Sequence, residues 1–162
     1  MMKHSTFAFD GFVLRSTNAQ DQHLAEEWTE ADPAHRGTPA AFWTTDKVDV
    51  KSFLLTDSQG PVFFFRMKAV WGMDPKGHVQ VWIQFPPGST RTLGERVWRG
   101  LIKGFAWLEG MMAQVGFEAV YFSTKNPKLA YFCRKRIGFV NTGRKDEQGE
   151  MILKRRLTTK AA

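Results

Sequence analysis

The stretch QFPPGSTRTLGERVWRGLIKGFAWLEGM, residues 84–111, joins two different apolar patterns. The run that leads into it, residues 77–85, alternates apolar and polar side chains as a half-buried strand does, whereas from Glu95 onward apolar side chains recur every three or four positions, as on one face of a helix. The loop between them begins with two prolines, a glycine and two hydroxyl residues, and Arg91 and Gly94 follow. Because the start of a helix exposes unpaired N–H groups and the positive end of the helix dipole, this loop predicts a phosphate site. An ordinary capped helix with a surface arginine stays open as the alternative.

Helix and strand patterns continue on either side of this stretch. The helix that starts at Glu95 should end before Gly116, and a second helix should begin with Asn126 as its N-cap and stop at Gly138. The first of these two carries an apolar stripe formed by Val97, Leu101, Phe105, Leu108, Met112 and Val115. Strands are predicted over 11–18, 51–57, 61–71, 77–85 and 118–124 and twice within 139–157, another helix over 19–32, and a loop with one helical turn over 34–48. This order indicates an α/β fold of the α+β type, with a mixed, largely antiparallel central sheet flanked by helices, in one domain over residues 1–162.

Charge is distributed unevenly along the chain. The formal net charge is +7, but residues 1–60 hold 5 Lys or Arg and 9 Asp or Glu, a net −4 that leaves +11 for the remainder. A basic C-terminal half fits nucleic acid, an anionic membrane surface or a polyphosphate cofactor, and charge alone does not choose among them. Most aromatic residues fall within strand or helix patterns, which favours a role in the core over stacking on bases.

Cysteine content and hydropathy exclude several classes of protein. Cys133 is the single cysteine, so the chain has no internal disulfide and no cysteine-rich metal site. A small buried side chain and a nucleophile both remain open as its role. The sequence has no apolar run of about 18 residues, and its N-terminus lacks the apolar segment of a signal peptide. We therefore expect a cytoplasmic protein without a membrane anchor or a bound metal.

Two motifs resemble those of one enzyme superfamily. Arg91–Arg96, placed between a strand and a long helix, is similar to the pyrophosphate signature Gln/Arg-x-x-Gly-x-Gly/Ala of the GNAT superfamily of acyl-CoA N-acyltransferases. Residues 126–139, a helix that opens near an Asn and ends in Gly-Phe, look like that family's second motif. The predicted order of strands and helices also matches the GNAT pattern over essentially the whole chain. The resemblance implies a GNAT-like fold and acetyl-CoA as the co-substrate.

The resemblance also implies which residues hold acetyl-CoA. The strand that ends at Phe85 corresponds to the family's bulged fourth strand, whose backbone amides hold the acyl thioester and the pantetheine. Asn126 corresponds to the residue that often contacts the pantetheine arm. The residues carried over are Gln84, Phe85, Arg91, Thr92, Leu93, Gly94, Glu95, Arg96 and Asn126. Arg96 departs from the family, which has Gly or Ala there, and this change either opens the loop differently or adds a charge to it.

The general acid is the second departure. The tyrosine that often protonates the leaving thiolate in the family is replaced here by Arg134. Tyr131, one helical turn earlier, is the nearby substitute, and a packed aromatic ring fits its position equally well.

The general base is predicted from strand alternation. If the strand over 77–85 alternates, His78, Gln80, Trp82 and Gln84 share one face, and His78 is the member whose type titrates near neutral pH. A solvent-exposed histidine at the strand end is the alternative. Acidic residues at 26, 27, 30 and 32 form either a rim that attracts a cationic amine or a solvated helix face. His35 and Arg36 follow, where the family usually lines its acceptor pocket.

The sequence thus predicts an acetyl-CoA-dependent N-acetyltransferase that transfers an acyl group by direct attack of an unidentified primary amine. The acceptor is a small molecule or a peptide amine. The alternative is a catalytically inactive GNAT-fold module that binds acyl-CoA or a partner, because the family's tyrosine and carboxylate are both missing. A nucleic-acid-binding protein is a third hypothesis, against which the phosphate loop argues. The oligomeric state is open, with a homodimer among the options.

Overall fold

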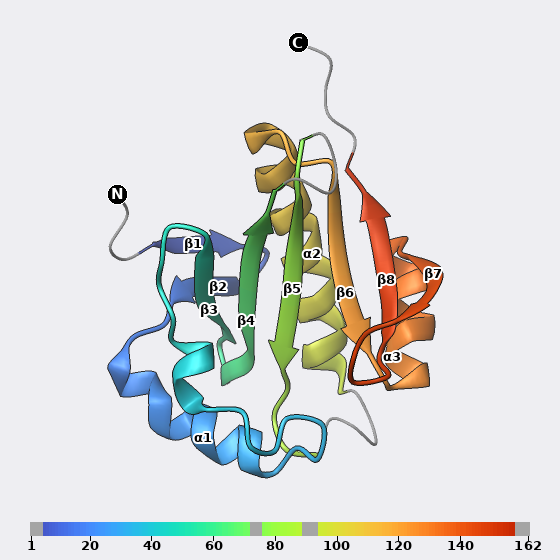
Figure 1. Cartoon of the computed structure of the whole chain (residues 1–162). Coiled ribbons are helices and arrows are strands. Elements are labelled where there is room, and N and C mark those ends of the chain that lie inside the picture. The colour runs from blue at the N-terminus through green and yellow to red at the C-terminus, as the bar shows by residue number, and fades with distance from the viewer. Residues whose placement is uncertain (1–4, 72–75, 89–93, 158–162) are drawn as a thin grey trace. The chain divides into compact units, whose positions relative to one another are not determined.

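The computed structural model describes residues 5–71, 76–88 and 94–157. Its strands are β1 (Thr6–Phe9), β2 (Phe12–Ser16), β3 (Val50–Asp57), β4 (Gly60–Val70), β5 (His78–Gln84), β6 (Ala119–Thr124), β7 (Val140–Lys145) and β8 (Met151–Arg156). Its helices are α1 (Gln22–Glu30), α2 (Glu95–Val115) and α3 (Pro127–Phe132), with short turns η1 (Ala19–Asp21), η2 (Ala40–Trp43) and η3 (Cys133–Ile137). The strands form one mixed sheet in the order β1-β2-β3-β4-β5-β6-β8-β7, which confirms the predicted fold class (Figure 1).

The sheet is mixed because β5 and β6 pair in parallel, with His78 opposite Ala119. A parallel pair needs a crossover connection, and α2 supplies it. The pairs β1–β2, β2–β3, β6–β8 and β7–β8 are antiparallel. By contacts the chain divides into two compact units: the first is Met1–Met67 with Ile83–Lys103, and the second is Lys68–Trp82 with Gly104–Ala162. The prediction of a single domain stays a prediction.

In the first unit the chain begins with a hairpin, where the sequence predicted one strand over 11–18. Asp10 and Gly11 have φ angles of 50° and 84° and form the two-residue turn between β1 and β2. Asp-Gly suits such a turn because both positions need positive φ. β1 is only four residues long and half exposed, so its apolar pattern was too short to indicate a strand.

Helices cover both faces of β3 and β4 in the first unit. Trp28 of α1 packs edge-on against Phe64, with ring centroids 5.4 Å apart. The Cα of Gly100 in α2 faces Leu55 and Phe63 instead. Because neighbouring side chains on a strand point to opposite faces, α1 and the N-terminal part of α2 lie on opposite sides of these strands.

The predicted stripe of α2 is buried with one exception. Val97, Leu101, Phe105, Leu108 and Met112 are buried, whereas Val115 is 62% exposed. Val115 is the last helical residue, next to Gly116 at φ 104°, where the chain turns away. The prediction for Val115 was therefore wrong, because periodicity does not show where the core ends along a helix.

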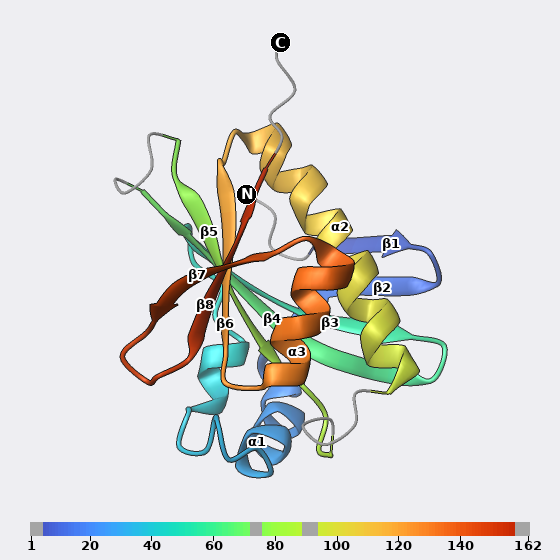
Figure 2. The same cartoon turned by 90° about the vertical axis from the view of Figure 1, so that its right-hand side faces the viewer.

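In the second unit, α3 and the C-terminal half of α2 lie on the same side of β6 and β8 (Figure 2). The ring of Phe105 packs against those of Phe122 and Phe139 at 6.0 and 5.2 Å. α3 begins as predicted, with the Asn126 side chain accepting hydrogen bonds from Lys128 N and Leu129 N and with Pro127 in the first turn. The helix continues through η3 and ends at Gly138, whose φ of 94° is left-handed. Among the described helices, none has the length and apolarity needed to cross a membrane.

Candidate functional site

β5 ends in a buried side-chain amide that contacts the segment following α1. Gln84 is fully buried, and its Nε2 donates to Asp32 Oδ2 and to Phe85 O, each at 3.0 Å. Its Oε1 lies 2.6 Å from Nδ1 of His35. Gln84 therefore links the strand end to the segment that follows α1.

These contacts determine the tautomer of His35. Both partners of Gln84 Nε2 are acceptors, which fixes the orientation of the amide and leaves Oε1 towards His35. An amide oxygen only accepts, so Nδ1 of His35 must carry the proton and donate it. Neutral His35 consequently has its lone pair on Nε2.

Local structure holds Asp32 and His35 in place. Asp32 follows α1, is buried, and accepts a hydrogen bond at Oδ1 from Ala34 N at 2.9 Å. Its Oδ2 lies 3.4 Å from His35 Nδ1. The ring of Trp43 in η2 packs against the imidazole with centroids 5.7 Å apart. The carboxylate, the amide and the indole thus restrict the imidazole on several sides.

The predicted phosphate loop leads from Phe85 to α2. Arg91, Thr92 and Leu93 lie outside the described residues. Gly94 precedes the helix, its carbonyl accepts the bond from Trp98 N, and described atoms leave the space beside its Cα open to 4 Å. The N-terminus of α2, from Glu95, therefore follows directly on an open glycine.

The charge of Arg96 is directed at a carboxylate within the first unit. Its guanidinium donates to both oxygens of Asp57, at 2.7 and 2.6 Å, and to the carbonyls of Gly60 and Pro61. The hydrogen bonds from Arg96 lower the pKa of Asp57 below its usual range. The positive charge of Arg96, which the sequence analysis considered for the loop, is thus paired with Asp57. Only the main chain of Arg96 remains available to bind a phosphate.

The other predicted residues belong to the second unit. The ring of His78 packs edge-on against Tyr121, with centroids 4.5 Å apart. The side-chain oxygen of Asn126 caps α3. Tyr131 is 61% exposed, so the alternative of a packed aromatic ring does not hold for it. Cys133 is buried, and burial raises the pKa of its thiol to about 12, which makes it unsuited to be a nucleophile.

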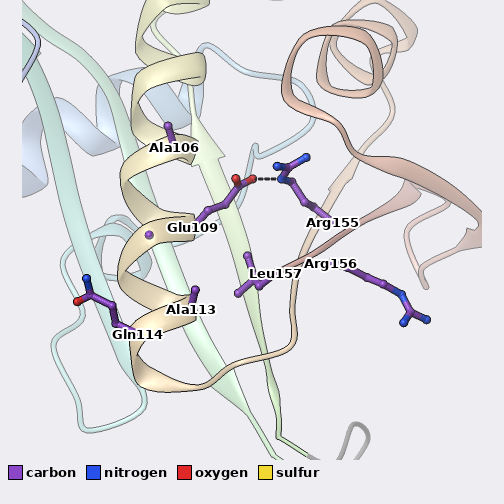
Figure 3. A pocket seen from close by; sticks show the side chains of 8 residues that line it. Ala106, Glu109, Ala113, Gln114, Arg155, Arg156 and Leu157 are labelled. Carbon is purple, nitrogen blue, oxygen red and sulfur yellow. Dashed lines mark ion pairs between the residues drawn. The ribbon is translucent and has the colours of Figure 1, made fainter. Parts of the chain in front are cut away.

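A pocket of about 520 Å³ lies in the second unit, and its lining contains none of the predicted site residues (Figure 3). It is lined by Ala106, Glu109, Gly110 and Ala113 of α2 and by Arg155 and Arg156 of β8, among others. Glu109 and Arg155 point towards each other in Figure 3 and form an ion pair at 2.5 Å. Burial raises the pKa of Glu109 even though Arg155 acts in the opposite direction. Among the described residues there is no group of three or more His, Cys, Asp or Glu that could hold a metal ion.

The linkage of Asp32, Gln84 and His35 was not predicted from the sequence. Each residue was noted for a separate reason: Asp32 for an acidic rim, Gln84 for its main chain and His35 for an acceptor pocket. The hydrogen bonds span 49 and 52 positions of the chain, which no local pattern reports. The available signal was a glutamine at the end of a strand whose neighbours are apolar, since a buried amide requires polar partners.

No protein-family model matches the chain, and no curated protein matches it in sequence. Solved structures do match. The aminoglycoside N(6')acetyltransferase from Legionella pneumophila subsp. pneumophila str. Philadelphia 1 superposes with a TM-score of 0.68 at 12% identity, over 93% of this chain and 94% of that one. The GNAT domain of S. lividans PAT gives a TM-score of 0.64 at 14% identity, over 90% of each chain. The chain has the GNAT fold.

A third GNAT-fold match carries ligands. The structure of AAC(6')-Ib in complex with ribostamycin and coenzyme A gives a TM-score of 0.67 at 13% identity, over 91% of this chain and 94% of that one. At these identities the likeness establishes the fold alone. The fold nevertheless agrees with the independent resemblance of the loop before α2 to the GNAT pyrophosphate signature.

Proposed function

We propose that this protein is an acetyl-CoA-dependent N-acetyltransferase that acts on a primary amine. The observation that carries the proposal is the connection from β5 to α2. β5 ends at Gln84, and the chain then runs through a loop rich in proline and glycine to Gly94 and the N-terminus of α2. A helix start of this kind attracts the negative charge of a pyrophosphate. The complex of AAC(6')-Ib with coenzyme A supports the same ligand on this fold.

Main-chain groups carry most of the proposed binding of acetyl-CoA. The side chains of Gln84 and Arg96 are engaged by Asp32 and Asp57, so both residues would contribute backbone N–H groups. The amides of Gln84 and Phe85 face the acyl thioester, and those from Arg91 to Arg96 wrap the pyrophosphate. Arg91 adds a positive charge, and Asn126 contacts the pantetheine arm. Backbone donors at the thioester oxygen stabilise the negative charge that develops in the transition state.

The reaction is a direct transfer. The amine nitrogen attacks the thioester carbon, the new C–N bond forms, and the C–S bond breaks with its electron pair on sulfur. One proton leaves the amine and one proton is needed by the thiolate. Tyr131 is the proposed donor to the thiolate, and its exposure leaves its hydroxyl accessible to a ligand. For the amine proton, the strand pattern offers His78 as one candidate acceptor.

A catalytically inactive acyl-CoA-binding module is the second candidate. It is favoured by Arg134 in place of the family's tyrosine and by the glutamine at the end of β5, where some relatives carry a carboxylate. The two candidates share acetyl-CoA binding and differ in amine-dependent release of the thiol.

Calorimetric titration with acetyl-CoA tests the shared part of the proposal. We expect saturable binding of one acetyl-CoA per chain, and Arg91→Ala should weaken it by about 1–3 kcal/mol through the loss of a charge-assisted hydrogen bond. Arg99→Ala removes an exposed arginine of α2 outside the loop and serves as the matched control. The absence of binding at millimolar acetyl-CoA would refute both candidates.

A further inference from the structure

We infer that His35 is the base that accepts the amine proton, and that Asp32 and Gln84 are positioning residues that hold its reactive tautomer. The inference rests on the proposed function and names the residue that performs one of its steps. It replaces His78 in that step with a histidine whose surroundings show a defined hydrogen-bond arrangement.

The direction of the hydrogen bonds determines which ring nitrogen of His35 carries the proton. His35 Nδ1 donates to Gln84 Oε1 at 2.6 Å, and Asp32 Oδ2 accepts from Gln84 Nε2 at 3.0 Å. Reversing the imidazole tautomer would place a lone pair against the lone pairs of Oε1. The tautomer with its lone pair on Nε2 is therefore the stable form of neutral His35. A general base needs such a lone pair to accept a proton.

His35 is the most exposed of the three linked residues. The side chain of His35 is 22% exposed, whereas Asp32 is 11% exposed and Gln84 is fully buried. Among the residues that the structure describes, none forms a hydrogen bond with Nε2. The hydrogen bonds of the three residues thus use Nδ1 of His35 and leave Nε2 without a described partner, on a side chain that is partly exposed.

A carboxylate lies beside the ring of His35. When His35 takes a proton at Nε2, the imidazolium has the carboxylate of Asp32 3.4 Å from Nδ1. An adjacent carboxylate stabilises an imidazolium and fixes its orientation, which is the role of the acidic residue beside a catalytic histidine in hydrolases.

The groups nearest this imidazole come from several elements, and Asp32 is the charged one in contact with it among the described residues. Asp32 follows α1, and Arg36 is the next residue in the loop. Arg66 of β4 stacks over Phe42, which in turn contacts Trp43. β5 contributes the neutral amide of Gln84, and η2 contributes the ring of Trp43.

The proton transfer completes the reaction as proposed. As the amine nitrogen bonds to the thioester carbon, His35 Nε2 takes one proton from that nitrogen. The C–S bond breaks with its electron pair on sulfur, and the thiolate receives its proton from a separate donor. The imidazolium later releases its proton to solvent, which restores the neutral tautomer.

The decisive variant is His35→Asn. The Asn side-chain amide can still donate to Gln84 Oε1, so the buried polar chain keeps its partner while the base is removed. We expect kcat to fall by about 10²- to 10⁴-fold, with the Kd of acetyl-CoA unchanged. In the wild type, kcat/KM should fall towards low pH. His35→Asn should no longer show this fall. His23→Asn, an exposed histidine of α1, is the matched control and should keep both kcat and the pH profile.

Two further measurements separate the outcomes. Nitrogen NMR of wild-type His35 should show the Nδ1–H tautomer, and Asp32→Asn should lower kcat with little change in KM. An Nε2–H tautomer, or a wild-type pH profile in His35→Asn with its loss in His78→Asn, would overturn the inference and leave the proposed function standing. Wild-type protein that binds acetyl-CoA but transfers to no amine would overturn both.

Discussion

Arg96 shows how a single side chain can be diverted from the role that its position indicates. The GNAT signature has Gly or Ala there, and the sequence left open whether the arginine adds charge to the loop. The guanidinium instead pairs with Asp57 through two hydrogen bonds. In a bidentate arginine–carboxylate pair of this kind, the carboxylate compensates the charge of the guanidinium, so the Arg96 side chain is not directed at a phosphate.

Arg96→Met should therefore affect stability more than ligand binding. We expect a loss of about 0.5–1 kcal/mol at pH 7, because the pair is partly exposed. The pKa of Asp57 is lowered in the folded state, so the pair stabilises the protein above the ordinary pKa of the carboxyl and loses its effect as pH falls through the lowered value. Urea unfolding of both proteins over this range measures the difference. A tenfold weaker acetyl-CoA affinity in Arg96→Met, at unchanged stability, would contradict this assignment.

Tyr131 is the residue on which protonation of the thiolate is proposed to depend. Tyr131→Phe should lower turnover by about 10²-fold, the lower end for general acid catalysis, and leave acetyl-CoA affinity nearly unchanged. Steady-state kinetics and calorimetry on the same preparations test this. Wild-type turnover in the variant would leave water or the ammonium product as the proton source.

At the scale of elements, α2 contains three glycines, and two of them, Gly100 and Gly110, lie in very different surroundings. A Cβ on Gly100 would lie 2.9 Å from Leu55 Cδ2 and 3.1 Å from Phe63 Cε2, and both side chains are buried. A Cβ on Gly110 would meet nothing described within 4 Å. The same substitution at these two positions thus separates packing from helix propensity.

Gly100→Ala should destabilise the protein by about 1 kcal/mol, because overpacking of about 1–3 kcal/mol exceeds the gain in helix propensity. Gly110→Ala should instead stabilise it by about 0.5–1 kcal/mol. Denaturant unfolding of the two variants provides the comparison. Equal stabilisation by both would mean that α2 does not approach β3 and β4 as closely as described.

The ion pair between α2 and β8 should make stability depend on pH in the opposite sense from Asp57. Burial raises the pKa of Glu109 in the folded state. A raised carboxyl pKa contributes stability below the unfolded value, about 4.3, and this contribution is lost as pH rises through the folded value. The unfolding free energy of the wild type should thus fall relative to that of Glu109→Gln as pH rises from about 4 to 7.

Glu147→Gln, at an exposed position in the turn before β8, controls for the removal of one carboxylate. If the wild type instead gains stability relative to Glu109→Gln with rising pH, the attraction of Arg155 outweighs the cost of burial.

At the scale of the whole molecule, local patterns predicted most of the fold. α2 was predictable because its apolar residues recur over 21 positions, and α3 because Asn126, Pro127 and Gly138 mark its ends. β1 was missed because four half-exposed residues carry too little pattern, although Asp-Gly, found at residues 10 and 11, is typical of a two-residue hairpin turn. Apolar periodicity and turn residues thus predict those elements that are long enough for the pattern to repeat.

The candidate site was less predictable than the fold, because its contacts join distant parts of the chain. Arg96 meets Asp57 across 39 positions, and Gln84 meets Asp32 across 52. Sequence reasoning assigned Arg96 and Gln84 to cofactor binding and Asp32 to a solvated or attractive rim, and it gave Asp57 no role. Pairing of buried polar side chains depends on tertiary structure, and single-sequence patterns contain no record of it.

We propose that this GNAT-fold protein transfers an acetyl group from acetyl-CoA to a primary amine. The most direct measurement is the release of free thiol from acetyl-CoA in the presence of a panel of amines, small molecules and peptides, with mass spectrometry of the products. We expect thiol release to depend on at least one amine, and this amine to gain one acetyl group. Saturable acetyl-CoA binding with thiol release no faster than in amine-free controls, across the whole panel, would contradict it and leave the inactive binding module.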